Sequence, residues 1–309
     1  MKRLLSLTII LVSVSFITSC SSNSKGEKTD KMEKVASKGV IHITAHDFKF
    51  SGPDSIPSGW VTINFTNQGK ETHFFLFNKI PDEISYQEYL DGLQPPFDNV
   101  WKALKDSGIT KSEAINRLVA GLPKWYGNVK QMGGAGFIDP GKSSTITLKL
   151  IPGNYEMECY MKTSSGVFHY ALGMVKQITV TNDSTNITPP KADIDITLTN
   201  HNIENSGAIT PGKHIVAVNF QEQPETGMGN DVHLVQIDDT TDINKVISYM
   251  DWLNIDGLQA PAPAHFLGGM QEMPAGNTAY FTVNLKKGRY AWISESYAQQ
   301  GMMKEFEVD

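Results

Sequence analysis

The chain has 309 residues, of which 40% are hydrophobic and 19% charged, and its formal net charge is −6. This acidic composition contains no basic stripe, which argues against nucleic acid as a partner. The two cysteines, Cys20 and Cys159, stand far apart in the sequence and are interpreted separately below.

Residues 1–19 have the pattern of a secretory signal. Lys2 and Arg3 precede an apolar stretch, residues 4–17, that is too short to span a bilayer. Small residues then precede Cys20, and this order resembles the lipobox of bacterial lipoproteins. The resemblance implies cleavage before Cys20 and attachment of lipid to it. The alternative is an ordinary secretory signal that happens to end near a cysteine. Ser21, where an inner-membrane protein usually has Asp, favours the outer membrane.

Residues 20–38 are rich in Ser, Lys, Glu and Asp, and we expect them to form a flexible tether. Removal of residues 1–19 takes away Lys2 and Arg3 and no acidic residue, so the net charge falls from −6 to −8. No later stretch is long and apolar enough to span a membrane. We therefore expect an exported protein that is held to the membrane by its lipid.

The rest of the chain is an internal duplication. Residues 133–159 align without a gap with residues 268–294, and the Gly-Gly pair and a later Gly-x-Tyr recur in both. A polar segment with two prolines, residues 183–192, separates the halves. We therefore predict two domains, residues 39–182 and 193–309, each long enough for its own core.

Each half consists of short, alternating, β-branched segments divided by Gly and Pro turns. Examples are residues 61–65, 144–150 and 278–285. This pattern predicts an all-β fold of two tandem Greek-key β-sandwiches. Tyr155 and Tyr290 each follow a glycine by two residues, as in a tyrosine corner.

Each half also carries a helical insert, at about 82–121 and at about 242–253. Thr110 and Glu113 have the spacing of a capping box that opens a helix. We expect the inserts to pack as lids on one end of the sandwiches.

The first half contains four residues with the chemistry of a metal site. Cys159, His169 and Met174 follow in that order on one loop between two strands, and His73 lies on an earlier strand. A thiolate, two imidazoles and a thioether are the ligands of a type 1 copper site. Cys159 has no partner for a disulfide, because Cys20 is assigned to the lipid. A lone cysteine in an oxidising compartment is either buried and inert or bound to something.

The ligand order on a β-sandwich resembles the cupredoxins, the plastocyanin-like copper proteins, over nearly all of the chain after the tether. The interval from His169 to Met174, with Gly173, is similar to the same loop of copper nitrite reductases. The interval from Cys159 to His169 is longer than in plastocyanin or azurin. The resemblance implies that His73, Cys159 and His169 are equatorial copper ligands and Met174 the axial one. It also implies electron transfer with a redox protein partner, or copper handling.

The second half lacks this ligand set. Ser294 stands at the cysteine position, no histidine follows on the loop, and only His233 and Met302 remain. We therefore predict at most one copper per chain, with the second half serving as a structural element or a partner-binding surface.

Other functions have weaker support in the sequence. Multicopper oxidases and nitrite reductases carry a histidine beside the copper cysteine, but here Glu158 and Tyr160 flank Cys159. There is no haem-attachment motif, phosphate-binding loop or hydrolase elbow, so we do not predict an enzyme. The main alternative is a copper-free tandem sandwich that binds a protein or glycan at the envelope. A third hypothesis is an enzyme that uses Cys159 as a nucleophile.

Overall fold

The structure is a computed structural model that describes residues 40–200, 202–225 and 228–309. The predicted signal (residues 1–19), the lipidation of Cys20 and the tether (residues 20–38) lie outside the described residues. Within the described part, no helix combines the length and apolar character that a membrane crossing requires.

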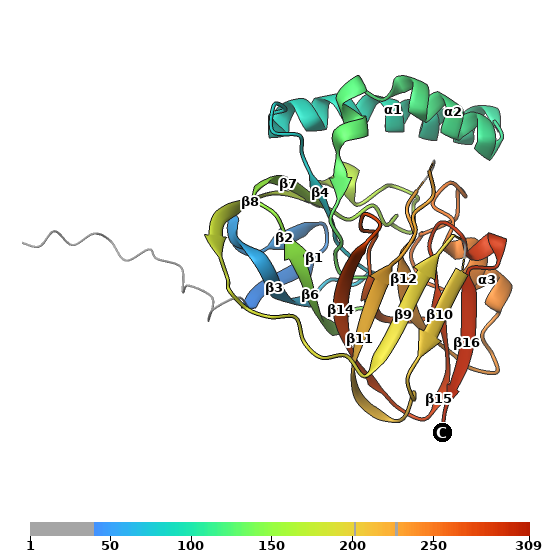
Figure 1. Ribbon diagram of the computed structural model, residues 1–309. Helices are drawn as coiled ribbons and strands as arrows, with labels where there is room; N and C mark the ends of the chain where they lie inside the picture. The colour runs from blue at the N-terminus through green and yellow to red at the C-terminus, as the bar shows by residue number, and fades with distance from the viewer. Residues whose placement is uncertain (1–39, 201, 226–227) are drawn as a thin grey trace, which may run out of the picture. The chain divides into compact units, whose positions relative to one another are not determined.

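The first half forms two layers of strands, which are blue to yellow-green in Figure 1. One layer contains β1 (Val40–His46), β2 (Lys49–Ser51), β3 (Ser55–Asn67) and β6 (Ser143–Leu150). The other contains β4 (Leu76–Lys79), β5 (Lys130–Gln131), β7 (Gly153–Glu158) and β8 (Val175–Ser184). Alternate residues of β1 and β3 are buried, which is the period expected of strands with one face on a core.

The second half has the same arrangement. One layer contains β9 (Ile194–Thr199), β10 (Asn202–Ser206), β11 (Gly212–Phe220) and β14 (Asn277–Leu285). The other contains β12 (Val232–Ile237), β13 (His265–Met270), β15 (Gly288–Ile293) and β16 (Met303–Val308). In both halves the first strand pairs in parallel with the third, β1 with β3 and β9 with β11. The predicted all-β sandwich fold with short helical inserts is confirmed.

The two halves join through strands that are equivalent in the repeat. β6 pairs antiparallel with β14, and Ile146 lies opposite Phe281, its own counterpart in the alignment of the halves. Thr145 pairs with Thr282, which is the counterpart of Thr147. Thr147 in turn pairs with Tyr280, which is the counterpart of Thr145. The Gly-Gly segments pair in the same manner, since Ala135 lies opposite Met270. The contact therefore has the reciprocal form of an interface across a twofold axis.

The two tyrosine corners are present. The hydroxyl of Tyr155 donates to the carbonyl of Ile151 at 2.7 Å, and the hydroxyl of Tyr290 donates to that of Lys286 at 2.9 Å. In each corner the buried ring packs in the core while the hydroxyl satisfies a loop carbonyl.

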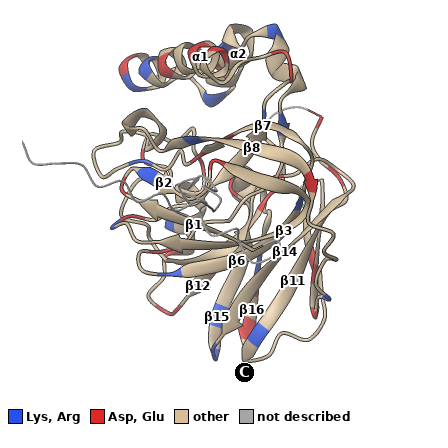
Figure 2. Cartoon of the chain, turned by 90° about the vertical axis from the view of Figure 1, so that its left-hand side faces the viewer, with Lys and Arg blue, Asp and Glu red and all other residues tan. Residues whose placement is uncertain are grey.

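The first helical insert consists of α1 (Tyr86–Ser107), α2 (Lys111–Gly121) and the short 3-10 helix η2 (Lys124–Asn128). The capping interaction is as predicted, because the Thr110 side chain accepts a hydrogen bond from the Glu113 N–H. The second insert contains α3 (Ile243–Tyr249), with Asp242 as its N-cap. Figure 1 shows α1 and α2 lying over one end of the sandwiches, and Figure 2 shows acidic and basic residues interspersed on the described chain.

The predicted linker begins two residues too early. β8 continues through Ser184, whereas the linker was expected to start at residue 183. The strand is longer because the start of β3 pairs with the end of β8, with Ser58 opposite Ser184. This pairing also connects the two layers of the first half.

Candidate metal centre

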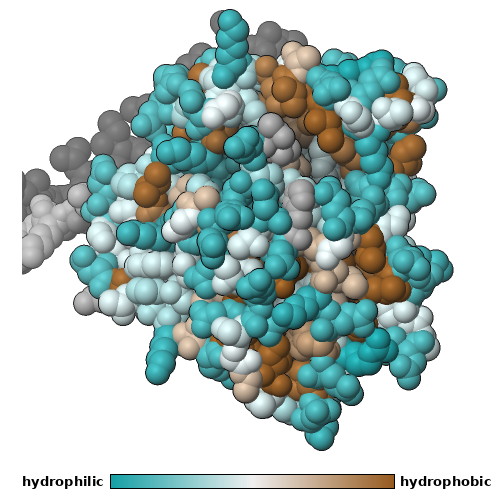
Figure 3. Space-filling view, turned by 45° about the vertical axis from the view of Figure 1, so that its right-hand side comes forward, coloured by the Kyte–Doolittle hydropathy of each residue, from teal (hydrophilic) through white to brown (hydrophobic). Residues whose placement is uncertain are grey.

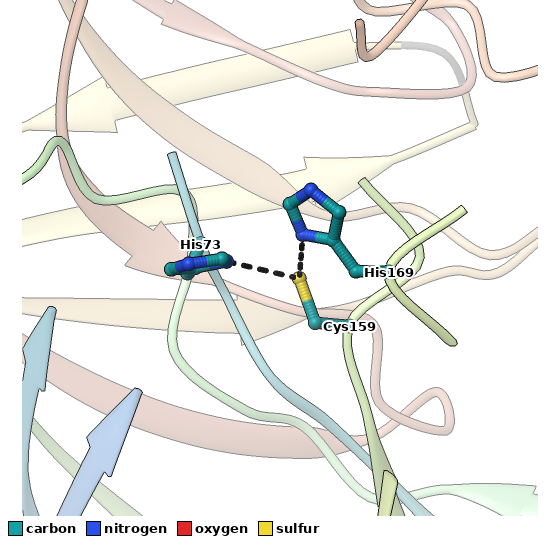
Figure 4. Close-up of side chains that lie close together, drawn as sticks. All are labelled: His73, Cys159 and His169. Carbon is teal, nitrogen blue, oxygen red and sulfur yellow. Dashed lines mark hydrogen bonds between the residues drawn. The ribbon is translucent and has the colours of Figure 1, made fainter. Parts of the chain in front are cut away.

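Three of the predicted ligands, His73, Cys159 and His169, lie close together, as Figure 4 shows. His73 lies between β3 and β4, where its backbone pairs with Ile138. Cys159 directly follows β7, and His169 precedes the short 3-10 helix η3 (Tyr170–Leu172). All three side chains are fully buried.

The spacing of the three ligand atoms suits a single ion. Cys159 Sγ lies 3.9 Å from His73 Nδ1 and 3.7 Å from His169 Nδ1, and the three atoms lie within 4.8 Å of one another. An ion with bonds of about 2.3 Å to sulfur and about 2.0 Å to nitrogen, at about 120°, would separate sulfur from nitrogen by about 3.7 Å. The two distances therefore fit one metal ion that would be held by the sulfur and both imidazoles.

Two carboxylates orient the histidines. His73 Nε2 lies 2.9 Å from Asp47 Oδ1, and His169 Nε2 lies 2.7 Å from Glu71 Oε2. Each Nε2–H donates to its carboxylate, so each Nδ1 keeps a lone pair that faces the sulfur. Two hydrogen bonds of 3.0 Å from the Lys70 N–H hold Asp47 in turn. Sequence reasoning missed Asp47 and Glu71.

The long interval between Cys159 and His169 folds into a hairpin. Lys162 pairs with Phe168, and the Gly166 N–H closes the turn on the carbonyl of Thr163 at 2.8 Å. The His169 N–H then donates to the carbonyl of Met161 at 2.7 Å. The extra residues of this loop extend away from the ligands, while the two ends of the loop lie side by side. The length of the loop therefore does not separate Cys159 from His169.

Lys162 anchors this hairpin to the second half of the chain. Its ammonium donates to the carbonyls of Asn254 at 2.7 Å and Ile255 at 3.1 Å, and its backbone N–H donates to that of Leu258 at 2.8 Å. The same ammonium lies 4.2 Å from the centre of the Trp101 ring. Contacts from both halves therefore fix the ligand loop.

Met174 lies beside the other ligands along the backbone. Its N–H donates to the carbonyl of His169 at 3.0 Å, and its carbonyl accepts from the Cys159 N–H at 3.2 Å. Its side chain is buried in the core of the first half. Its role as the axial ligand stays a prediction.

Burial keeps the metal-free ligands neutral. It raises the pKa of the Cys159 thiol to about 12, although the backbone N–H groups of Phe74 and Met161 act in the opposite direction. Burial, with a smaller effect of His73, lowers the pKa of His169 to about 3, and burial also lowers the pKa of His73. Both imidazoles are therefore ready to bind at neutral pH, whereas the thiol must first lose its proton.

In the second half, the side chains at the corresponding positions are engaged in hydrogen bonds. His233 Nδ1 accepts from the Phe137 N–H at 3.1 Å, and its Nε2 lies 2.9 Å from Asp231. Ser294, which replaces the cysteine, donates to the same carboxylate at 2.7 Å. Asp231, His233 and Glu295 are close enough together to suggest a second metal group. However, a neutral imidazole has one acceptor nitrogen, and the Phe137 N–H already uses that of His233.

No protein-family model matches the chain, and no curated protein sequence matches it. Among solved structures it is similar to a reduced auracyanin from Roseiflexus castenholzii, with 21% identity and a TM-score of 0.27, over 46% of this chain and 97% of that one. It is also similar to auracyanin A, described as a "blue" copper protein, from Chloroflexus aurantiacus, with 18% identity and a TM-score of 0.28, over 46% and 98% of the two chains. A multicopper oxidase is 15% identical over 87% of this chain and 88% of its own, with a TM-score of 0.23.

Proposed function

We propose that this protein is a tandem cupredoxin with one type 1-like copper site in its first half, acting in electron transfer or copper handling. His73, Cys159 and His169 would hold the ion, and Met174 would be a further ligand. The observation that carries the proposal is the convergence of one sulfur and two Nδ1 atoms within 4.8 Å in a fully buried position. A soft thiolate with two imidazoles is a ligand set suited to copper.

Bound copper would supply a one-electron redox couple. The protein's own contribution is a fixed set of ligands, since both imidazoles are held through Nε2 by carboxylates and the hairpin is held by Lys162. Fixed ligands favour rapid electron transfer, because little rearrangement accompanies a change of oxidation state. The second half, whose equivalent histidine is engaged by Phe137 and Asp231, would be structural or bind a redox protein partner.

We also propose that the protein is an exported lipoprotein, anchored through Cys20 to the outer membrane. This part of the proposal rests on the order of the basic, apolar and lipobox segments in residues 1–20. Metabolic labelling with a tagged fatty acid would test it, because Cys20→Ala should abolish incorporation.

Titration of the purified chain with copper(II) tests the copper site. An intense absorption band should appear at about 600 nm, the region of thiolate-to-copper charge transfer, and should saturate at about one ion per chain. Copper should bind these ligands more tightly than zinc, so added zinc should weaken the band only when it is present in large excess. Titration to several equivalents without such a band would contradict the proposal.

Loss of either orienting carboxylate should weaken copper binding. Asp47→Ala and Glu71→Ala should each lower the affinity by about 10- to 100-fold, because the histidine loses the partner that fixes its tautomer and ring orientation. Affinity is measured by competition with a chelator. Asp82→Ala is the matched control, since this carboxylate lies on the surface with Lys79. Equal affinities in all three variants would show that the carboxylates do not position the ligands.

A further inference from the structure

A cavity of about 130 Å³ lies between the first helical insert and the candidate metal centre. Its wall includes the neighbours of both Cys159 and His169, namely Glu158, Tyr160, Phe168 and Tyr170. Its volume is close to the about 150 Å³ of an engineered protein cavity that binds benzene, and far above the about 30 Å³ that one water takes in the liquid. The cavity therefore has room for a small organic molecule.

Three acidic side chains line this cavity, the exposed Asp98 and the less accessible Glu158 and Glu272, and the last two have no cationic partner. Glu158 receives a hydrogen bond of 2.8 Å from Asn78, and Glu272, which is only 8% exposed, receives one from the Gly229 N–H. Each contact engages one carboxyl oxygen. Within the described residues, no Lys, Arg or His forms an ion pair with either group, and the second oxygen of Glu272 receives no hydrogen bond. A buried carboxylate without a counter-charge is costly, which favours a positively charged ligand.

Burial raises the pKa of Glu272 to about 7, and the nearby carboxylates of Asp231 and Glu158 act in the same direction. The Gly229 N–H acts in the opposite direction. Glu272 is therefore mostly ionised at pH 8. A ligand cation would stabilise this charge, which no basic side chain does in the described part of the protein.

The rest of the wall is rich in aromatic rings. Phe97 on α1 and Trp252 in the second half both line the cavity, with ring centres 6.1 Å apart, and Tyr126 and Tyr160 add two further rings. Aromatic faces attract cations, most strongly when water is excluded. The Lys162 side-chain nitrogen lies 4.2 Å from the centre of the Trp101 ring of the same wall, and burial lowers the pKa of this amine to about 7. Figure 3 shows hydrophobic side chains at the level of the insert, near the top of the view.

We propose that this cavity binds a small organic cation, a quaternary ammonium or a protonated amine, between the Glu272 carboxylate and the Trp252 ring. The proposal does not depend on the metal, because the cavity and its acidic groups are formed by the protein alone. A bound cation would contact the residues on either side of Cys159 and His169, so it would sit directly beside the candidate copper site.

Calorimetric titration of the full chain with choline at pH 8 tests the proposal. We expect saturable binding, and at least tenfold weaker binding of the uncharged isostere in which carbon replaces the quaternary nitrogen. Glu272→Gln, which keeps the size of the side chain, should weaken choline binding at least tenfold, or about 1.4 kcal/mol. Trp252→Leu should weaken it by a similar factor. Glu113→Gln, on the exposed face of α2, is the matched control and should change nothing.

Choline binding is measured on the chain before any copper is added, so this result is independent of the outcome for copper. Circular dichroism of each variant shows whether the fold is retained, and Glu272→Gln is expected to retain it. Equal binding of choline and the uncharged isostere, unchanged binding in Glu272→Gln, or no binding at millimolar choline would each overturn the proposal.

Discussion

The Cys159→Ser variant is expected to lose the band at about 600 nm and to bind copper at least about 1,000-fold more weakly than the original chain. Cys159 supplies the only soft anionic donor of the cluster, and the other two donors are neutral imidazoles. A serine hydroxyl is a hard donor that does not ionise near neutral pH. The loss corresponds to about 4 kcal/mol of binding free energy.

Absorbance and chelator competition measure this effect, with Ser294→Ala as the control. Ser294 occupies the equivalent position in the second half and contacts Asp231 instead of the cluster, so its removal should leave the band intact. The original chain should release about one proton per copper at pH 7, since the thiol pKa of about 12 keeps Cys159 protonated before binding. Retention of the band in Cys159→Ser would mean that copper binds elsewhere.

The Gly134→Ala variant is expected to lose more than about 4 kcal/mol of unfolding free energy, enough to prevent folding at moderate temperature. A Cβ at Gly134 would lie 1.8 Å from the carbonyl oxygen of Phe75. Neither backbone is free to move, because the Phe75 N–H bonds to Ala135 at 3.3 Å and the Gln271 N–H bonds to the Gly134 carbonyl at 3.1 Å. The glycine permits a close approach of three backbone segments.

Urea denaturation followed by circular dichroism measures the loss. Gly127→Ala is the matched control, because a Cβ at Gly127 meets no atom within 4 Å. It should change stability by less than about 1 kcal/mol. If Gly134→Ala proved as stable as Gly127→Ala, the close approach of the Gly134 and Phe75 backbones would be wrong.

The local elements could be predicted because their signals lie within a few residues. Alternating burial in β1 follows from alternating hydrophobicity, and the start of α2 follows from the Thr110 hydroxyl capping the Glu113 N–H. The end of β8 was misjudged, since Ser184 joins the strand only through its pairing with Ser58, far away in the chain. The polar composition of the sequence predicted that residues 183 and 184 belong to a linker, but the pairing with β3 makes them part of β8.

The candidate site also contains residues that the sequence could predict and residues that it could not. The identity of Cys159, His169 and Met174 as possible ligands came from their order on one loop. The two carboxylates were not visible, because Asp47 and Glu71 reach their histidines across 26 and 98 residues of chain. No spacing rule connects residues at such separations.

By itself, the sequence determined the strands, the helical inserts, the repeat and the types of ligand available, because neighbouring residues encode these features. Only the tertiary structure decided that the hairpin returns His169 to Cys159, that equivalent strands β6 and β14 join the halves, and that a cavity with Glu272 lies behind the site. These features arise from packing between distant segments. They are determined by burial of apolar side chains and by hydrogen bonding over the whole molecule. The pattern of neighbouring residues in the sequence does not determine them.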